Sequence, residues 1–206
     1  MGYTNTLMSD EARFRDLLHT NFDRYKELTD RETSLLYTHY ELLSRWNRVL
    51  NLTSIQKLEE IVLRHYCESL FLTIHLPEKS ATVLDVGSGP GFPGIPLAIL
   101  RPDCTVVLAE SHQRKAVFLR EATRELPNVR VAPKRADQVG KSFEWVVSRA
   151  VRWADVLKVV TGNCALLLGQ EDARSLTAVV DFHWQNPIVL PWGDRRVLAI
   201  GNKCTS

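Results

Sequence analysis

Hydrophobic residues in the first part of the chain recur every three or four positions, which is the period of an amphipathic helix. Thr29 and Glu32 have the spacing of a capping box and open the clearest of these patterns. A second helical pattern covers residues 57–72, and Pro77 ends the helical region. The recurring positions of the first pattern are Leu35, Leu36, His39, Tyr40, Leu42, Leu43, Trp46 and Leu50. We therefore expect residues 1–78 to form a helical extension.

The pattern changes near residue 80, where short apolar runs begin to alternate with helical segments. The runs expected to form strands are 82–86, 105–109, 129–131, 145–147, 165–168, 178–182 and 197–200. The helices expected between them are 95–100, 112–125 and 154–160. Such alternation is typical of right-handed βαβ units, so we expect residues 79–206 to form an α/β domain with a mostly parallel sheet. No helical pattern separates the last two strands, which indicates that one of them is antiparallel.

Composition narrows the class of protein. The 206 residues include 26 Lys and Arg and 24 Asp and Glu, a formal net charge of +2, which permits RNA binding through local basic patches. No apolar run approaches the ~20 residues that cross a bilayer, and the N-terminal stretch lacks the apolar core of a secretory signal. Cys67, Cys104, Cys164 and Cys204 form no CxxC pair. We expect reduced thiols, no metal site and a cytoplasmic location.

The most informative segment is 84–94, which reads LDVGSGPGFPG and stands between an apolar strand and a helix. Gly87, Gly89 and Gly91 allow the backbone to turn tightly and a ligand to touch the main chain. The alternative is a tight turn that needs left-handed backbone and binds nothing. Four glycines in eight residues after a strand favour a nucleotide-type cofactor.

The glycine spacing separates two classes of cofactor. A dinucleotide fingerprint is G-x-G-x-x-G, and counted from Gly87 its third glycine would fall on Phe92. Counted from Gly89, the third glycine of the fingerprint falls on Gly94, but Gly91 opens the wrong spacing and two prolines, Pro90 and Pro93, crowd the turn. Asp85 followed by G-x-G-x-G is similar to the first motif of S-adenosylmethionine methyltransferases. That cofactor has no pyrophosphate, so its loop need not keep the dinucleotide spacing.

Acidic residues after the next two strands are further candidates for the cofactor site. Glu110 ends the second strand, where a carboxylate can accept hydrogen bonds from both ribose hydroxyls. A solvated glutamate at a strand end is the alternative. Ala136 and Asp137 follow the third strand, where the chain of this fold passes the adenine. Asp137 is therefore a candidate acceptor for the exocyclic amine, with a surface turn as the alternative.

The loop after the fourth strand, residues 148–152, favours methylation of a ring nitrogen over an amino group or C5. Amino-group methylases carry a polar residue, two prolines and an aromatic residue here, and C5-pyrimidine methylases need a nucleophilic cysteine; this loop has neither. Guanine N7 carries a lone pair and no proton at neutral pH, so we assign no general base. Arg149 is a candidate for a two-point contact with the cofactor carboxylate or with an RNA phosphate. Its alternative is an ordinary surface arginine.

A series of short motifs has a recognisable order. They are Trp46-Asn47 with Asn51-Leu52-Thr53, Arg64-His65 with Ser69-Leu70, the segment 85–94, Phe118-Leu119-Arg120 and Ser148-Arg149-Ala150. Together they cover roughly residues 30 to 170, and their order and spacing resemble the bacterial 16S rRNA guanine-N7 methyltransferase family, also called glucose-inhibited division protein B. The resemblance implies a Rossmann-like S-adenosylmethionine methyltransferase fold with a mostly parallel seven-stranded sheet and an N-terminal helical extension.

The resemblance also implies a substrate and a set of contacts. The substrate is a guanine in the decoding region of 16S rRNA, within the 30S subunit or its assembly intermediate, and the enzyme is a monomer. The residues expected at S-adenosylmethionine are Asp85, Gly87, Gly89, Gly91, Phe92, Glu110, Ala136, Asp137 and Arg149. The residues expected at the RNA are Asn47, Asn51, Arg64, Lys134 and Arg152.

The C-terminal part departs from the family pattern. The family's fifth strand ends in Leu-Lys-Gly after a Gly-Gly turn, whereas residues 161–164 read TGNC and Leu168-Gly169 lacks the lysine. Three other functions therefore stay open: a small-molecule methyltransferase of the same fold, a nicotinamide-dependent oxidoreductase and a non-catalytic ribosome-assembly factor. Phe92 breaks the dinucleotide fingerprint and argues against the oxidoreductase. A steep loss of affinity with salt would distinguish an RNA substrate from a small molecule.

Overall fold

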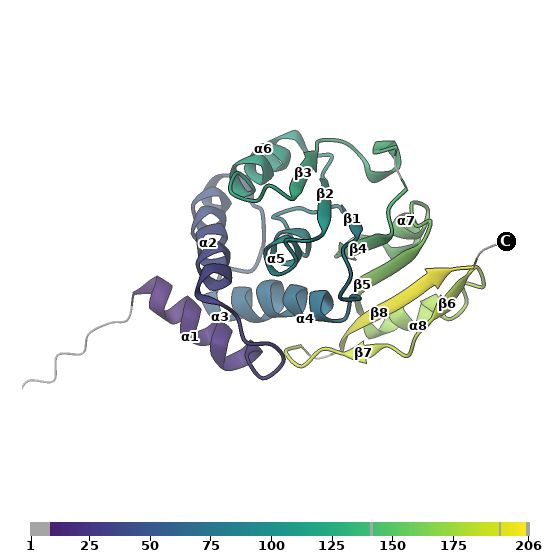
Figure 1. Cartoon of the computed structure of the whole chain (residues 1–206), viewed down its shortest axis with the longest axis horizontal. Coiled ribbons are helices and arrows are strands. Elements are labelled where there is room, and N and C mark those ends of the chain that lie inside the picture. Colours follow the sequence, from purple (N-terminus) through teal and green to yellow (C-terminus); the bar gives the residue numbers. More distant parts are fainter. Residues whose placement is uncertain (1–8, 141, 194, 205–206) are drawn as a thin grey trace, which may run out of the picture.

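The first elements of the chain are helices (Figure 1). The computed structural model describes residues 9–140, 142–193 and 195–204. Helix α1 spans Asp10–Phe22 and α2 spans Asp30–Leu50. The predicted capping box is present, because Thr29 Oγ1 accepts the N–H of Glu32 at 3.2 Å and the Glu32 carboxylate accepts the N–H of Thr29 at 2.7 Å. Two N–H groups that the start of α2 would leave unpaired are thus bonded.

The second predicted helix contains a π-helical segment. Helix α3 (Leu58–Ile61) continues into the π-helix η1 (Val62–Cys67) and then into α4 (Glu68–Ile74). The prediction of a helix over residues 57–72 is confirmed in extent, but its single regular period is wrong. A π-helical turn changes the direction of the side chains that follow it, and such turns are frequent at functional sites. Here four of the six residues of η1 are buried, namely Val62, His65, Tyr66 and Cys67.

The strands form one sheet, which is eight-stranded within the described residues. Their bounds are β1 Thr82–Val86, β2 Thr105–Ala109, β3 Val129–Ala132, β4 Trp145–Arg149, β5 Asn163–Gly169, β6 Phe182–Trp184, β7 Ile188–Val189 and β8 Arg196–Lys203. Their order is β3-β2-β1-β4-β5-β8-β6, with β7 paired to β8. Strands β1 to β5 are parallel, as predicted. The order reverses between β1 and β4, and ligands of such sheets bind at the carboxyl ends of the strands beside this reversal.

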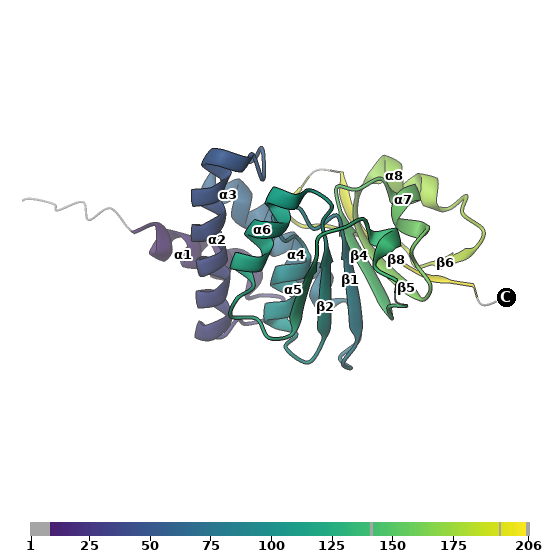
Figure 2. The ribbon, with the colours of Figure 1, turned by 90° about the horizontal axis from the view of Figure 1, so that it is seen from above.

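Helices cover both faces of the sheet (Figure 2). The helices between strands are α5 Gly94–Leu100, α6 Gln113–Ala122, the short 3₁₀ helix η2 Ala136–Gln138, α7 Trp153–Leu157 and α8 Gln170–Leu176. The N-terminal helices, α5 and α6 lie on one side in Figure 2, and α7 and α8 lie on the other. Each face has its own hydrophobic core, with Val83 in the first and Leu84 in the second. This alternation confirms the α/β prediction.

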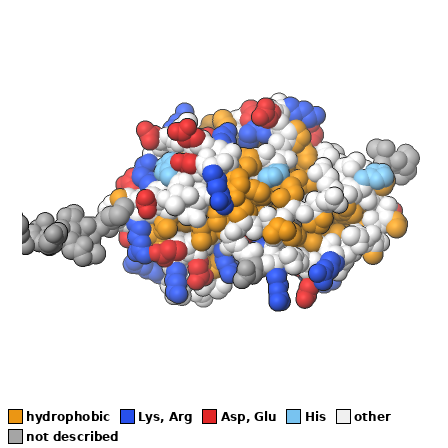
Figure 3. All heavy atoms as spheres, turned by 90° about the horizontal axis from the view of Figure 1, so that it is seen from below, with side chains coloured by type: hydrophobic (Ala, Val, Ile, Leu, Met, Phe, Trp, Pro, Cys, Tyr) orange, Lys and Arg blue, Asp and Glu red, His pale blue; other side chains and the backbone are white. Residues whose placement is uncertain are grey.

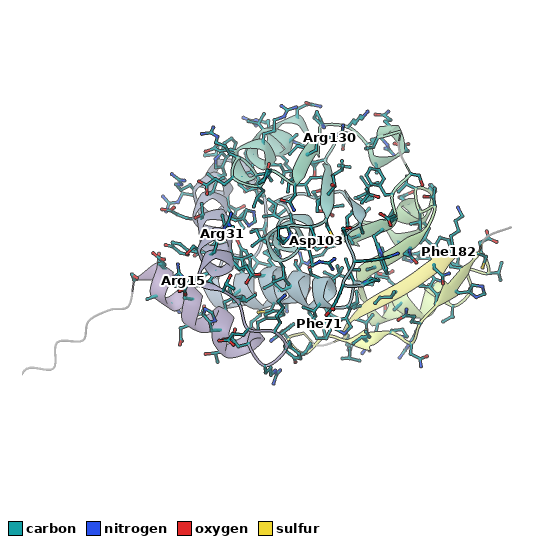
Figure 4. All side chains as sticks on the ribbon, viewed as in Figure 1. Arg15, Arg31, Phe71, Asp103, Arg130 and Phe182 are labelled. Carbon is teal, nitrogen blue, oxygen red and sulfur yellow. The ribbon has the colours of Figure 1, made fainter. Side chains whose placement is uncertain are left out.

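The C-terminal part corrects two expectations. Residues 178–182 were predicted as a strand, but only Phe182 belongs to one, because the strand β6 begins there. Val180 is apolar yet 86% exposed, so the hydrophobic signal came from a surface turn. Helix α8 and strand β7 were not predicted. Strand β8 runs antiparallel to β5 and β6, which confirms the predicted reversal. In Figure 4, Phe182 and Arg130 mark β6 and β3, the two edges of the sheet.

The segment after β7 returns to the N-terminal helices (Figure 1). The Trp192 ring lies edge-on to Phe71 of α4, with ring centroids 5.7 Å apart, and to Tyr25, at 5.5 Å. The helical extension therefore shares one hydrophobic core with the sheet. The division between residues 1–78 and 79–206 stays a prediction.

The face shown in Figure 3 carries hydrophobic side chains among charges of both signs, with no continuous basic patch. In the described part of the chain, no helix is long and apolar enough to cross a membrane.

Candidate active site

The loop after β1 has a backbone that glycine adopts most easily. Gly87, Gly89 and Gly91 have φ angles of +68°, +54° and +95°. A Cβ atom on Gly87 would also lie 2.6 Å from Cγ2 of Val151, in the loop after β4. The N–H of Gly87 donates to the carbonyl of Ala109 at 2.9 Å, which ties the loop to β2. A side chain at Gly87 would therefore meet both backbone strain and a steric clash.

Asp85 is fully buried beneath this loop. Its Oδ2 accepts the N–H of Gly94 at 3.0 Å, and a Cβ atom on Gly94 would lie 2.6 Å from that oxygen. Its Oδ1 is buried without a hydrogen-bond partner in the described residues. Burial raises the pKa of Asp85 to about 7, and the nearby Glu110 carboxylate contributes in the same direction. These contacts give Asp85 a role in supporting the loop, and its contact with the cofactor stays a prediction.

Glu110 lies just past the end of β2 and bonds to two backbone amides. Its Oε2 accepts the N–H of Gly89 at 2.9 Å, and its Oε1 accepts the N–H of His112 at 2.7 Å. The side chain is buried, so these bonds fix its orientation. Each carboxylate oxygen can accept a further hydrogen bond. Glu110 therefore both anchors the glycine loop and keeps acceptor capacity for ribose hydroxyls.

A cavity of about 220 Å³ lies at the carboxyl ends of the strands. Gly87, Lys134, Ala136 and Asp137 line it, although they come from two separate segments of the sequence, the loop after β1 and the loop after β3. Val151 also lines it and was not among the predicted residues. A bare glycine backbone, the Glu110 carboxylate bonded to it and an exposed aspartate in the lining of the same cavity fit the adenosine part of S-adenosylmethionine. The individual contacts with the cofactor stay predictions.

The ring of Phe92 points away from this cavity into the helical extension. It stacks on His65 with ring centroids 4.6 Å apart and meets Tyr66 edge-on at 5.0 Å. Any contact that Phe92 makes with the cofactor must therefore use its backbone. His65 is buried and bonded to Thr53 through Nε2 at 2.9 Å. Burial, followed by the charge of Arg149, lowers the pKa of His65 to about 2, so its imidazole is neutral.

A buried histidine of α2 holds the glycine loop from the side of the helical extension. His39 Nε2 lies 2.9 Å from the carbonyl oxygen of Pro90, and the Tyr66 hydroxyl lies 2.9 Å from His39 Nδ1. The imidazole therefore donates to Pro90 and accepts from Tyr66. Burial lowers the pKa of His39 to about 4, which keeps this arrangement neutral. In the sequence pattern, His39 is distinguished only by its place on the apolar face of a predicted helix.

Arg149, the last residue of β4, belongs to a buried ion-pair cluster with Glu68 and Arg196. Its Nε lies 3.4 Å from Glu68 Oε2. Arg196 Nε and Nη2 each lie 2.9 Å from an oxygen of the same carboxylate. Burial lowers the pKa of Arg149, partly offset by Glu68. Arg149 is therefore no ordinary surface arginine, and both ligands proposed for it remain open.

The expected RNA-contact residues differ in accessibility. Arg64, Lys134 and Arg152 are exposed, as is Asn51, which ends α2 with a φ of +46°. The side chain of Asn47 bonds to the backbone of Thr53: its amide oxygen accepts the N–H of Thr53 at 2.9 Å, and its Nδ2 donates to the carbonyl of Thr53 at 3.1 Å. The motif that contains Asn47 thus closes the loop after α2. A contact between Asn47 and RNA stays a prediction.

Comparison with known proteins identifies the family. The family model described as rRNA small subunit methyltransferase G matches residues 32–172. The chain is 37% identical over 174 residues to the ribosomal RNA small subunit methyltransferase G of Haemophilus ducreyi, covering 80% of this chain and 82% of the relative. It is 44% identical over 128 residues to the protein of that name from Chromobacterium violaceum, covering 60% and 61%.

Solved structures show the same fold at low identity. The magnesium protoporphyrin IX methyltransferase of Synechocystis PCC 6803, determined with bound SAM, aligns with a TM-score of 0.54 and 12% identity over 98% of this chain and all of that one. The fibrillarin pre-rRNA processing protein of Methanococcus jannaschii aligns with a TM-score of 0.53 and 14% identity, covering 62% and 69%. The predicted Rossmann-like methyltransferase fold is confirmed. Together with the family match, these findings establish that the chain belongs to the rRNA small subunit methyltransferase G family.

Proposed function

We propose that this protein transfers a methyl group from S-adenosylmethionine to N7 of a guanine in 16S ribosomal RNA. The observation that carries this proposal is the family match over a chain whose glycine loop, Glu110 and Asp137 gather at one edge of the sheet. Members of the family are named for small-subunit rRNA methylation. The guanine-N7 target comes from the family, and the loop after β4 is consistent with it, because that loop lacks the motifs for amino-group and C5 methylation.

S-adenosylmethionine is the cofactor, and it supplies a methyl group on a positively charged sulfur. Glu110 would accept from its ribose hydroxyls while holding the N–H of Gly89. Asp137, which lines the cavity, would accept a hydrogen bond from the adenine amine. The glycines of the loop carry no side chain, so the ligand could approach their backbone, and Val151 leaves no room for a Cβ atom at Gly87. These residues bind and orient the donor.

The chemistry needs no proton acceptor from the protein, because N7 attacks through its own lone pair. His65 is unsuited to that task, since it is buried, neutral and bonded to Thr53. Cys67, Cys104 and Cys164 are buried, which removes them as nucleophiles toward a base. What this chain provides is alignment of the two reactants, an effect that can lower a barrier by about 7–11 kcal/mol.

The RNA is expected at the edge that carries the cavity. Lys134 lines the cavity and is exposed, and Arg152 is exposed in the loop after β4. Such side chains bind phosphates and fix the register of the RNA without reading its sequence. A base in a structured RNA must leave its stack to reach the donor. We infer that a monomer acts in the cytoplasm on the 30S subunit or its assembly intermediate, with residues 1–78 contributing to the RNA contact.

Mapping N7-methylguanosine in 16S rRNA from cells with and without the protein tests the function directly. The modified nucleoside should disappear on deletion and return with the wild-type chain, but not with Glu110→Ala at limiting cofactor. Detection of N6-methyladenosine or 5-methylcytidine instead would contradict the N7 assignment. Activity on a purified 16S rRNA fragment should fall steeply with salt, since phosphate contacts release counterions. A salt-independent reaction would favour a small-molecule substrate.

A further inference from the structure

The buried cluster around Glu68 distributes its bonds unequally. Arg196 contacts both carboxylate oxygens at 2.9 Å, whereas Arg149 reaches one of them at 3.4 Å. The Glu68 side chain is fully buried, and the side chains of Arg149 and Arg196 are 13% and 25% exposed. A two-point contact with normal lengths is the strong geometry for an arginine and a carboxylate. Arg196 therefore holds Glu68, and Arg149 is only loosely attached.

The cluster also carries a surplus positive charge. One carboxylate faces two guanidinium groups, and the neighbouring His65 is neutral. Arg64, on the same helical segment, adds a further positive charge that acts on both His65 and Arg149. A charge held away from water without a partner is costly unless an opposite charge joins it. The surplus at Arg149 is thus suited to an anionic group of a ligand.

We propose that Arg196 is a positioning residue that occupies Glu68 and so keeps the guanidinium of Arg149 available for an anionic group of the substrates. This inference rests on the proposed function. The anionic group is either the carboxylate of the methyl donor or a phosphodiester of the RNA. Without Arg196, both oxygens of Glu68 would be open to Arg149, which would form its own two-point pair and lose the ligand contact.

The fold explains how a residue so late in the chain reaches this site. Strand β8 is antiparallel to β5, so its first residue, Arg196, pairs with Gly169 at the end of β5. The start of β8 therefore lies at the edge where β4 and β5 end. Arg196 also lines a cavity of about 370 Å³ together with Val151 and Gly169. Val151 lines the first cavity as well, so the cluster borders the space next to the predicted donor site.

Replacing Arg196 by Gln tests the proposal. The variant keeps Glu68 paired with Arg149, so the cluster changes from a net charge of +1 to neutral and the fold should persist. We expect methylation of a 16S rRNA fragment to fall at least tenfold with little change in melting temperature. In the double variant Arg196→Gln/Glu68→Gln, the competing carboxylate is gone, and activity should recover severalfold. If Arg196 had only a structural role, removing the Glu68 carboxylate as well would not restore methylation activity.

Two binding probes distinguish the sources of the anion. S-adenosylhomocysteine carries the amino-acid carboxylate, and methylthioadenosine lacks it. If Arg149 holds that carboxylate, Arg196→Gln should weaken binding of the first probe about tenfold in calorimetry and leave the second unchanged. If Arg149 holds RNA, both affinities should stay and the KM for the RNA fragment should rise. These binding measurements stand even if the wild-type chain makes no N7-methylguanosine, which would overturn the proposed function separately.

Two further variants complete the design. Arg196→Lys keeps the charge with a single-point contact and should fall between the wild type and Arg196→Gln. Arg130→Gln makes the same charge change on the exposed edge strand β3 (Figure 4) and should behave as the wild type. Wild-type activity in Arg196→Gln overturns the proposal. A well-folded double variant that is as inactive as Arg196→Gln also overturns it.

Discussion

The proposed active site lies at the edge of the sheet where the parallel strands end, and the two sides of this edge are held together by different kinds of interaction. On the β1–β2 side, Glu110 and Asp85 accept hydrogen bonds from backbone N–H groups of the glycine loop, within 21 and 9 residues along the chain. On the β4–β8 side, Glu68 meets Arg149 and Arg196 across 81 and 128 residues. The first half is fixed by local backbone geometry and the second by side-chain charges brought together by folding. A substitution in the first half should therefore act mainly on cofactor binding. One in the second half should change the charge balance of the cluster, and through it either stability, when Glu68 is removed, or the ligand contact of Arg149, when an arginine is changed.

The largest effect is expected from Glu68→Ala. The variant leaves the guanidinium groups of Arg149 and Arg196 without their shared partner, and breaking a buried ion pair in this way costs about 3–5 kcal/mol of unfolding free energy. Urea unfolding should show this loss. Glu144→Ala is the matched control, because its carboxylate is exposed at Thr82 and its loss should cost much less. Equal stability of the two variants would mean that solvent already screens the cluster.

The second prediction concerns the pH dependence of stability through His39. Its pKa is lowered to about 4 in the fold, against an ordinary value of 6.5. Between these values the unfolded state binds the extra proton, so this contribution is complete above pH 6.5 and is lost as the pH falls. At pH 5 the free energy of unfolding should be about 2 kcal/mol lower than at neutral pH because of His39. This loss should be absent in His39→Gln, in which the side-chain amide can replace the bond to Pro90.

Comparing the two chains across pH isolates the histidine. Burial raises the pKa of Asp85 to about 7, so its effect on stability has the opposite sign, falling as pH rises from 3.8 to 7. Both chains retain Asp85, and its effect cancels in the difference. Parallel pH profiles for the wild type and His39→Gln would show that His39 is accessible to protons in the fold.

The third prediction is confined to the β1–β2 half. Glu110→Ala removes a charged acceptor from the ribose, and cofactor affinity should weaken by about 1–3 kcal/mol. Activity should partly return at saturating S-adenosylmethionine, because the lost contact acts on ground and transition states alike. Calorimetry with S-adenosylhomocysteine measures the effect, and NAD should not bind to either chain. Unchanged affinity would assign Glu110 to loop anchoring alone.

The difference between a side held by local backbone bonds and a side held by distant charged residues also explains which site residues the sequence could predict. The glycine loop, Glu110 and Asp137 follow directly after strands, so their meeting at one edge follows from parallel pairing alone. The role of Arg196 left no local signal, since only the antiparallel return of β8 brings it to Glu68. Phe92 was expected at the cofactor from its motif, and a contact through its backbone stays a prediction. Its ring packs on His65 of the π-helix, whose period the pattern did not reveal.

The C-terminal errors have a related cause. Apolar residues near Val180 resemble a strand in number, but no partner strand covers them, and the chain turns there instead. Helix α8 is short and has only Ala173 and Leu176 buried, too few positions to show a helical period. Tertiary context thus decided both segments. The central parallel strands β1, β2, β4 and β5 are mostly apolar and buried, and their places along the chain were predicted correctly.

The smallest loss is expected from Arg149→Lys. An ammonium keeps the charge but cannot reproduce a planar two-point grip, so about 1 kcal/mol of ligand binding should be lost, roughly a fivefold change. Arg149→Ala should lose more. If the partner is the methyl donor, both variants should bind S-adenosylhomocysteine more weakly and methylthioadenosine normally. If the partner is RNA, affinity for the donor should survive while methylation falls at limiting RNA. Normal folding, normal donor affinity and full methylation in both variants would rule out both roles and confine the function of this half to stability.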